Sequence, residues 1–479
     1  MDPITQAGVE IATSTLMKRA PIAFELARDF KSHGKRLALV GGSVRDAILG
    51  RLGNDLDFTT DAHPDLTKRI LSKRLEHLWD TGARFGTISG RGVGFLIEIT
   101  TYRSESYQQD SRKPAVEFGK TIDVDLSRRD FTINAMALEL TSDAPVFIDP
   151  YHGVVDLAKK LIRTPLTPEI SFSDDPLRML RAIRFAAQLG FAIGEDVSTA
   201  IAAMRGRLEI ISAERIREEF TKIILSDQPR IGIELLVESG LAEIFIPEVP
   251  KLQLEVDEHH HHKDVYQHSL KVLEQAIALE DRLGGPNLVI RLAALLHDIG
   301  KPKTKRLIDG GGVSFYHHEV VGAKMTRERL KALRFDADLI KEVSHLVFLH
   351  LRFHGYGNGE WTDSAVRRYV RDAGNLLEHL HVLTRADCTT RNRAKADSLA
   401  KSYDSLEERI TKLAQKEELS KIRPELDGEE IMRILGIKPG PVVGKAYEHL
   451  LELRIEEGPL GKERAEEELL NWWRLNGNT

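Results

Sequence analysis

Two aspartates placed two positions apart are the first residues of this chain that could do chemistry. Asp55 and Asp57 lie in a segment typical of a strand, where side chains alternate between two faces, so both carboxylates should point to the same face. Hard divalent cations prefer such oxygen ligands. Two cations held there could activate a hydroxyl and bind triphosphate oxygens during in-line displacement. An isolated Asp-x-Asp, by contrast, is usually a solvated loop.

A glycine turn precedes the two aspartates. The apolar run 37–40 is typical of a strand, Gly41 and Gly42 follow it, and residues 44–49 have the pattern of a helix start. Glycines let the backbone approach a phosphate, and a helix N-terminus supplies free N–H groups and positive dipole. Arg45 adds a bidentate phosphate donor. A lone Gly-Gly is usually a turn, but the order strand, glycines, helix and acidic strand indicates a nucleoside triphosphate site.

A third motif, at residues 128–135, completes a resemblance to a known family. With residues 40–46 and 55–57, it resembles the head-domain motifs of class II tRNA nucleotidyltransferases, a family that includes bacterial poly(A) polymerases. The resemblance implies an α/β head, with a nucleotidyltransferase-type mixed sheet and helices, followed by all-α neck, HD and tail domains. It also implies that Asp55 and Asp57 are catalytic and hold Mg²⁺. The nucleotide-binding residues that it implies are Gly42, Arg45, Arg129, Asp130, Asn134, Asp175, Arg178, Arg181 and Arg184.

A polar row accompanies the helix predicted over residues 175–184. Ser173 is a plausible N-cap, Pro176 fits a first turn, and Leu177, Leu180 and Ile183 form an apolar stripe. Acidic and basic residues recur every three positions beside that stripe, and such rows are commonly solvated, salt-bridged faces. The family resemblance instead implies that Asp175 and Arg178 read the base edges of CTP and ATP.

A second group of candidate ligands follows residue 258. The pair His297-Asp298 ends an apolar helix before Gly300, which can direct an imidazole and a carboxylate to one metal. This region resembles HD-superfamily metal-dependent phosphohydrolases, which implies a divalent transition metal bound by His268, His297, Asp298 and Asp387.

Further histidines could complete a second metal position in the same region, although an isolated histidine is more often a core or surface residue. The candidates are His317, His318, His345, His350 and His354, of which we prefer His318 and His350. The run of four histidines at 259–262 is predicted to be an ordinary surface stretch.

Composition indicates an enzyme of several domains. A chain of 479 residues should divide into three or four parts. The single cysteine and the lack of a leader or membrane-length apolar stretch predict a cytoplasmic protein with no membrane partner. We predict an N-terminal helix (1–33), a catalytic head (34–147), a base-recognising neck (148–250), an HD-type metal-binding domain (251–400) and a helical, tRNA-binding tail (401–479).

The net charge of −5 means that RNA must be bound by local patches. One candidate is the polar segment 102–117, in which Tyr102, Arg103 and Tyr107 could contact nucleic acid, although it could equally be a hairpin connection. Another is a basic cluster that could also be a solvated helix face; it comprises Arg385, Arg391, Arg393, Lys395 and Lys401.

The predicted function is template-independent addition of CMP and AMP, from CTP and ATP, to the 3′ end of tRNA, and the predicted partner is the 3′ end and acceptor arm of tRNA. The closest alternative is a poly(A) polymerase, built from the same parts, although residues 136–138 look more like the CCA-adding branch. An alternative of another class makes the HD domain, as a phosphodiesterase or phosphatase, the main activity. The sequence leaves the oligomeric state open.

Overall fold

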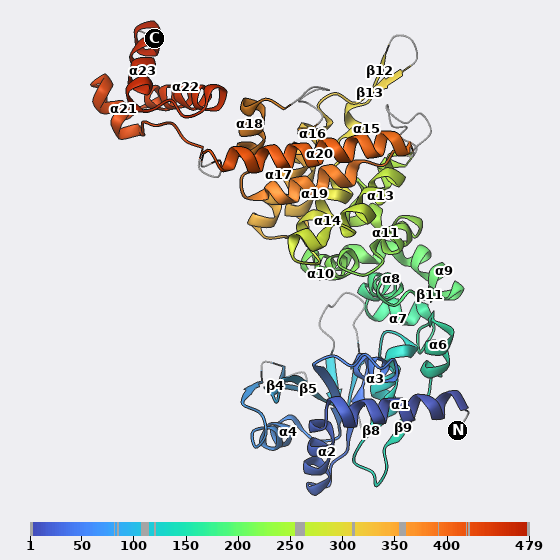
Figure 1. Cartoon of the computed structure of the whole chain (residues 1–479). Helices are drawn as coiled ribbons and strands as arrows, with labels where there is room; N and C mark the ends of the chain where they lie inside the picture. The colour runs from blue at the N-terminus through green and yellow to red at the C-terminus, as the bar shows by residue number, and fades with distance from the viewer. Residues whose placement is uncertain are drawn as a thin grey trace. The chain divides into compact units, whose positions relative to one another are not determined.

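The structure is a computed structural model that forms two compact units, Met1–Phe245 and Ile246–Thr479, each described here by itself (Figure 1). It describes residues 3–80, 82–83, 86–106, 115–118, 121–253, 264–308, 312–353, 361–390, 392–417, 419 and 422–476, without the side chains of 103–106, 115–118, 308 and 312.

A seven-stranded mixed sheet forms the head, as predicted. Its strand order is β3-β4-β5-β2-β1-β8-β9, which places β2 at the centre. The strands are β1 (Leu37–Val40), β2 (Asp55–Thr60), β3 (His77–Trp79), β4 (Thr87–Gly92), β5 (Phe95–Thr101), β8 (Ala137–Glu139) and β9 (Val146–Ile148). Only the β2–β5 pair is parallel among the strand pairs of this sheet. The central strand therefore carries the two aspartates, and its parallel neighbour runs beside them.

Short helices and a hairpin surround this sheet. They are α3 (Gly42–Ile48), α4 (Pro64–Leu71), α5 (Ile122–Ser127) and the 3₁₀ turn η2 (Thr132–Asn134), with β6 (Arg103–Ser106) paired to β7 (Ala115–Phe118). The pairing of β6 with β7 is the hairpin connection that the sequence left as an alternative for segment 102–117.

The single N-terminal helix predicted over residues 1–33 is wrong, because two helices occupy this segment. They are α1 (Pro3–Arg19) and α2 (Ile22–Ser32), and Pro21 lies at the N-cap of α2. A proline inside a continuous helix would lose a hydrogen bond and clash with the preceding turn, so the chain breaks there. Helix α1 packs on α3 and on α6 (Gly153–Lys159).

The neck is helical, as the resemblance implied, and the helix predicted over residues 175–184 begins only at Leu177. The neck helices are α7 (Pro168–Asp174), α8 (Leu177–Leu189), α9 (Glu195–Met204), α10 (Ala213–Ile224), α11 (Pro229–Glu238) and α12 (Ala242–Phe245). Ser173 is not the N-cap of α8, because it lies in the last turn of α7. Asp175 is extended, since the following Pro176 disfavours a helical conformation, and its Oδ1 accepts a hydrogen bond from the Leu177 amide at 3.1 Å.

The second unit is almost wholly helical. Its elements are α13 (Val265–Ile277), α14 (Leu288–Leu296), α15 (Lys301–Thr304), the hairpin β12 (Arg306–Ile308) and β13 (Gly312–Ser314), α16 (His318–Ala332), α17 (Ala337–Leu349), α18 (Asp363–Ala373), α19 (Leu377–Asp387) and α20 (Arg393–Ala414). Helix α20 packs on α18 and α19, and it crosses the domain boundary predicted between residues 400 and 401 (Figure 1).

Three helices at the end of the chain enclose a small core of their own. They are α21 (Gly428–Leu435), α22 (Pro441–Glu457) and α23 (Lys462–Asn476), and their shared core includes Ile431, Leu450 and Leu469. In the part of the chain that the structure describes, no helix combines the length and apolar character needed to span a bilayer.

Candidate functional site

The two aspartates of β2 share one face of the head sheet. Leu56 between them is buried, whereas Asp55 and Asp57 remain exposed on the other face. The parallel register pairs Asp57 with Glu98 of β5, so a third carboxylate lies beside the two that the sequence predicted. Glu98 was missed because only the strand pairing brings it here.

The electrostatics of this face suit divalent cations. The protein atoms packed around Asp57 remove part of its hydration and raise its pKa; the carboxylates of Glu98 and Asp55 act in the same direction, whereas Arg129 opposes them. Like-charged carboxylates held together favour either protonation or a bound cation. The donor set therefore fits the Mg²⁺ ions that the family resemblance implied.

The glycine turn brings a cation to the acidic face. Gly41 has φ +67°, and a Cβ atom added there would lie 2.6 Å from Arg129 Nη1. Arg129 Nη2 donates to Asp125 Oδ2 at 3.2 Å, and its buried Nε has no hydrogen-bond partner among the described residues. Ser43 ties the turn to β2, because its Oγ accepts from the Asp57 amide at 3.0 Å and donates to the Asp55 carbonyl at 3.2 Å. The turn thus holds an incompletely satisfied guanidinium beside the carboxylates.

The other predicted phosphate donor, Arg45, is held within the protein. Its Nε and Nη2 donate to Asp46 at 3.0 and 2.9 Å, and its Nη1 donates to Asn134 Oδ1 at 2.7 Å. Asn134 Nδ2 in turn donates to Asp130 Oδ1 at 3.0 Å, while Arg181 Nε donates to Asp130 Oδ2 at 2.8 Å. Direct phosphate binding by Arg45 therefore stays a prediction, and in this structure its guanidinium braces α3 against η2.

The polar row of α8 is also an internal brace rather than a solvated face. Arg178 Nη1 donates to Ser171 Oγ at 2.9 Å, and its Nη2 donates to the Arg128 carbonyl at 2.5 Å. Asp175 Oδ2 forms a 2.8 Å ion pair with Arg215. The proposed base-reading pair is thus positioned by its own protein partners.

A buried charge cluster continues this brace. Arg184 pairs with Glu219 of α10 at 3.1 Å, and burial lowers the pKa of the Arg184 guanidinium although Glu219 opposes this. The guanidinium carbons of Arg45, Arg181 and Arg184 lie 5.2, 5.8 and 4.3 Å from the centre of the Phe185 ring. Phe185, Arg215 and Glu219 were not predicted, since their roles depend on contacts between helices.

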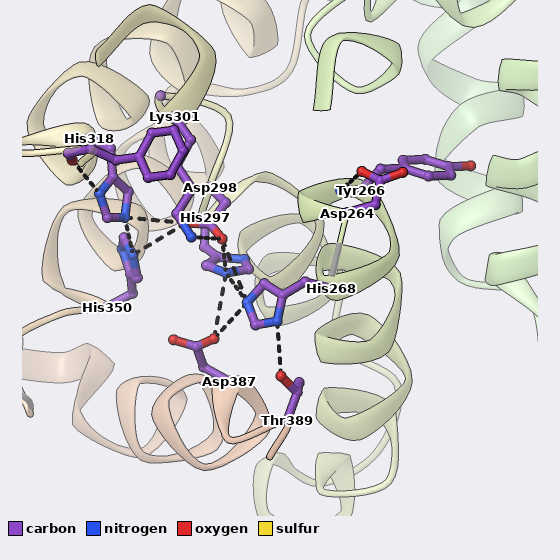
Figure 2. A network of polar contacts seen from close by, with 12 residues as sticks. Asp264, Tyr266, His268, His297, Asp298, Lys301, His318, His350, Asp387 and Thr389 are labelled. Carbon is purple, nitrogen blue, oxygen red and sulfur yellow. Dashed lines mark hydrogen bonds and ion pairs between the residues drawn. The ribbon is translucent and has the colours of Figure 1, made fainter. Parts of the chain in front are cut away.

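All six ligands predicted for the second unit come together, as Figure 2 shows. They form two groups, His268 with His297 and Asp387, and Asp298 with His318 and His350; within each group the potential ligand atoms lie within 4.8 Å of one another. Five of the six side chains are buried and Asp387 is half-buried. His268 lies within α13 and Asp387 ends α19, whereas the other four residues lie at or just beyond the ends of α14, α16 and α17, so the bundle assembles the centre.

Three of the histidines are oriented by their own backbone. The Nδ1 atoms of His297, His318 and His350 lie 2.9, 2.9 and 2.6 Å from the carbonyl oxygen three residues earlier. A carbonyl oxygen only accepts, so each Nδ1 carries a proton, and Nε2 is the ring nitrogen that can bind a cation once it is deprotonated.

Asp298 joins the two groups. Its Oδ1 lies 3.2 Å from His318 Nε2, and its Oδ2 lies 3.1 Å from His297 Nε2 and 3.0 Å from Lys301 Nζ (Figure 2). Burial opposes ionisation of Asp298, but His297 and Lys301 outweigh it and hold its pKa well below the usual range. The Oδ2 atom accepts no well-aligned hydrogen bond from the described residues. An ionised carboxylate shared by two histidine groups fits two adjacent cations.

The pKa values of two histidines in this centre, His297 and His350, are shifted in opposite directions. Burial alone would lower the pKa of His297, yet Asp298 raises it to about 9, whereas burial lowers the pKa of His350 to about 3. Without a cation, the protein thus compensates its buried carboxylates by protonating one imidazole.

The remaining histidine candidates do not reach the centre where they are described. His317 is exposed at the N-cap of α16, and His345 Nε2 lies 2.7 Å from the Asp372 carbonyl. Residues 259–262 and His354 lie outside the described residues.

Two of the residues predicted to contact nucleic acid, Tyr102 and Arg385, have other contacts in the structure. The contact predicted for Tyr102 is wrong, because its side chain packs in the core beside Ala38 and Val40. Arg385 pairs with Asp404 and Glu407 at 2.8 Å, so it belongs to a salt-bridged helix face. The side chain of Arg103 and all of Tyr107 and Arg391 lie outside the description, whereas Arg393, Lys395 and Lys401 are on α20.

Comparison with known proteins finds matches in both units of the chain. Family models match at residues 37–163 (poly A polymerase head domain), 190–252 (probable RNA and SrmB-binding site of polymerase A) and 265–418 (HD domain). The chain is 31% identical to the A-adding tRNA nucleotidyltransferase of Deinococcus radiodurans, over 87% of this chain and 91% of that one. It is 40% identical to the CCA-adding enzyme of Lactobacillus helveticus, over 46% of this chain and 54% of that relative.

The fold also matches a solved structure, that of the Bacillus stearothermophilus CCA-adding enzyme in complex with CTP. The two chains align over their whole lengths with a TM-score of 0.68, and they are 22% identical, so this likeness concerns the fold. Together with the long match to the Deinococcus radiodurans relative, these findings show that the chain belongs to the tRNA nucleotidyltransferase and poly(A) polymerase family, in the branch that carries an HD domain.

Proposed function

We propose that this protein adds CMP and AMP, from CTP and ATP, to the 3′ end of tRNA. The observation that carries the proposal is the acidic face of β2 beside the Gly41 turn and Arg129. Relatives named CCA-adding enzyme and A-adding tRNA nucleotidyltransferase support tRNA as the acceptor.

In this proposal the residues of the head hold the reacting groups in place. Asp55 and Asp57 are the Mg²⁺ ligands, and Glu98 adds negative charge beside them. The bound ions would activate the tRNA 3′-hydroxyl and stabilise the charge on the phosphates as pyrophosphate leaves. Arg129 is suited to hold the triphosphate, because its half-buried guanidinium lies beside Gly41 and its Nε has no hydrogen-bond partner among the described residues.

Base recognition is assigned to Asp175 and Arg178. A carboxylate can accept from an exocyclic amine, and a guanidinium can donate to a ring nitrogen or carbonyl. Both side chains already have partners, Arg215 for Asp175 and Ser171 for Arg178. The Asp175 carboxylate keeps free lone pairs beside its contacts with Leu177 and Arg215, so a base edge can bind it in place, which makes Arg215 a determinant of how Asp175 is presented.

The deciding experiment uses two acceptors and one nucleotide at a time. With tRNA that ends at the discriminator base, CTP should add two residues, and ATP should then add one. With tRNA that ends in CC, ATP alone should add one residue. Long tails made from ATP, with CTP ignored, would instead identify a poly(A) polymerase.

Addition of the terminal AMP alone is the second candidate. It is favoured by the Deinococcus radiodurans relative, which is named as an A-adding enzyme and matches most of this chain. One AMP added to tRNA ending in CC, with no CMP added to tRNA ending at the discriminator base, would select it.

A second activity is proposed for the HD domain. We propose that the six-residue centre binds divalent transition metal and hydrolyses a phosphate ester, because Asp298 lies between two histidine groups as an ionised, buried carboxylate. Metal analysis of the purified protein tests the first part. Hydrolysis of 2′,3′-cyclic nucleotides with Mn²⁺, Ni²⁺, Co²⁺ or Mg²⁺ tests the second, and Asp298→Asn should abolish it.

A further inference from the structure

One histidine of the HD centre is held differently from the other three. His297, His318 and His350 direct Nδ1 at a carbonyl of their own local backbone, three residues earlier. His268 instead has its Nδ1 3.0 Å from Oγ1 of Thr389, a residue 121 positions further along the chain (Figure 2). The orientation of His268 therefore depends on a tertiary contact.

The segment that carries Thr389 is itself held by Gln275. The Gln275 side-chain amide donates to the carbonyls of Ala386 and Cys388, at 2.6 and 3.0 Å, on either side of Asp387. Gln275 follows His268 by seven residues on α13, so both side chains lie on the same face of that helix, which packs on α19. One helix face thus holds the end of α19 at two points.

This segment also delivers a candidate ligand. Asp387 Oδ1 lies 3.0 Å from His268 Nε2 and 3.6 Å from His297 Nε2, and its pKa is held below the usual range because His268 and His297 outweigh the effect of burial. A shift of residues 386–389 would therefore move Asp387 and the partner of His268 together.

The effect of Thr389 on His268 depends on whether its hydroxyl donates or accepts the hydrogen bond. A carbonyl only accepts, whereas a hydroxyl can donate or accept, so the tautomer of His268 is set by which of these Thr389 does. When Thr389 accepts from Nδ1–H, Nε2 is the ring nitrogen left to bind a metal, as in the other three histidines. We infer that Thr389, placed by Gln275, is a positioning residue that presents His268 Nε2 to the metal. This inference rests on the proposed metal-binding function of the HD centre.

The test compares three variants of the full-length chain. Thr389→Val keeps the shape but removes the hydroxyl, Thr389→Ser keeps the hydroxyl, and Gln275→Met removes the amide that holds the segment. Binding of Mn²⁺ and Ni²⁺ should weaken by about 10- to 100-fold in Thr389→Val, remain near the wild-type value in Thr389→Ser, and weaken less in Gln275→Met. Nucleotide addition to tRNA, unchanged in all three, reports that the chain is folded.

A second readout does not depend on metal. Nitrogen-15 spectra of histidine-labelled, metal-free protein should show the His268 Nδ1 resonance shifted by its hydrogen bond to Thr389 in the wild type and in Thr389→Ser, and without that shift in Thr389→Val. Equal metal affinity in Thr389→Val and wild type would overturn the inference. If the wild type binds neither metal, the proposed HD function fails. An unchanged His268 Nδ1 resonance in Thr389→Val would refute the positioning role by itself.

Discussion

The acidic face of the head and the HD centre both hold carboxylates suited to cations, but the first set is exposed and the second is buried. Asp55 and Asp57 stand two residues apart on one strand and stay exposed, whereas the six HD residues span positions 268–387 and are almost wholly buried. Water therefore stabilises the first set of charges, and the protein must stabilise the second.

The pKa directions follow from this difference. In the head, partial desolvation and neighbouring carboxylates raise the pKa of Asp57, and Arg129 offsets them only in part. In the HD centre, burial is stronger, yet His297 and Lys301 hold the pKa of Asp298 well below its ordinary value. At an exposed site, bound ions and the substrate can neutralise the excess negative charge of the carboxylates. At a buried site, charged groups of the protein itself must neutralise it.

The strongest test of this comparison separates the two sites by paired substitutions. Asp55→Ala should lower CMP and AMP incorporation by about 1,000-fold, or about 4 kcal/mol of activation free energy, because the metal ligands are lost. Asp298→Asn should leave incorporation unchanged and abolish phosphoester hydrolysis. Steady-state assays of both reactions on both variants check this. Near-normal addition by Asp55→Ala would refute the head mechanism.

A smaller effect is expected at the glycine turn. Gly41→Ala should lower the kcat/KM of nucleotide addition by about 10- to 100-fold, because an alanine is strained at φ +67° and its Cβ would displace Arg129. Gly50→Ala is the matched control, since Gly50 has φ +70° but no atoms near a Cβ position. It should cost about 1 kcal/mol of stability and no activity. Equal losses in both variants would show that backbone strain, not Arg129, matters.

The closed centre predicts a stability change that the open site does not. Mn²⁺ at about 100 times its dissociation constant should stabilise the second unit by about 2.7 kcal/mol, because only the folded chain assembles the six ligands. Differential scanning calorimetry should record a higher unfolding temperature for that unit in wild type and in Asp55→Ala. The increase should disappear in Asp298→Asn, and its persistence there would place the metal elsewhere.

The smallest expected effect concerns the pH dependence of the head. Mg²⁺ needs ionised ligands, so addition should fall as the pH drops through the raised pKa of Asp57. Glu98→Gln removes one cause of that increase, and the acid limb of the pH–rate profile should move to lower pH by less than about one unit. Glu76→Gln, on the exposed surface, is the control. A limb that stays in place would show that Glu98 does not raise the pKa of Asp57.

Local sequence patterns predicted the elements that carry each site, but they did not predict the contacts between distant segments of the chain. The strand with Asp55 and Asp57, the turn at Gly41 and the His297-Asp298 pair are short-range signals, so the mixed-sheet head and the six HD ligands could be proposed from the sequence. Glu98, Arg215 and Thr389 could not, because their roles follow from strand register or helix packing. Tyr102 was misassigned, since a polar neighbourhood in sequence does not reveal that its ring fills the core.

The sequence by itself determined which chemistry is available: paired carboxylates after a glycine turn, a recurring row of arginines, and histidines with a His-Asp pair. Those signals depend on residue type and on spacing within one element. The backbone geometry of a strand or a helix then determines which of the spaced residues share a face. Only the tertiary structure decided which arginines are engaged within the protein, which carboxylate joins Asp57, and what holds His268. These outcomes depend on distances between segments far apart in the chain, which are set when the apolar faces pack together.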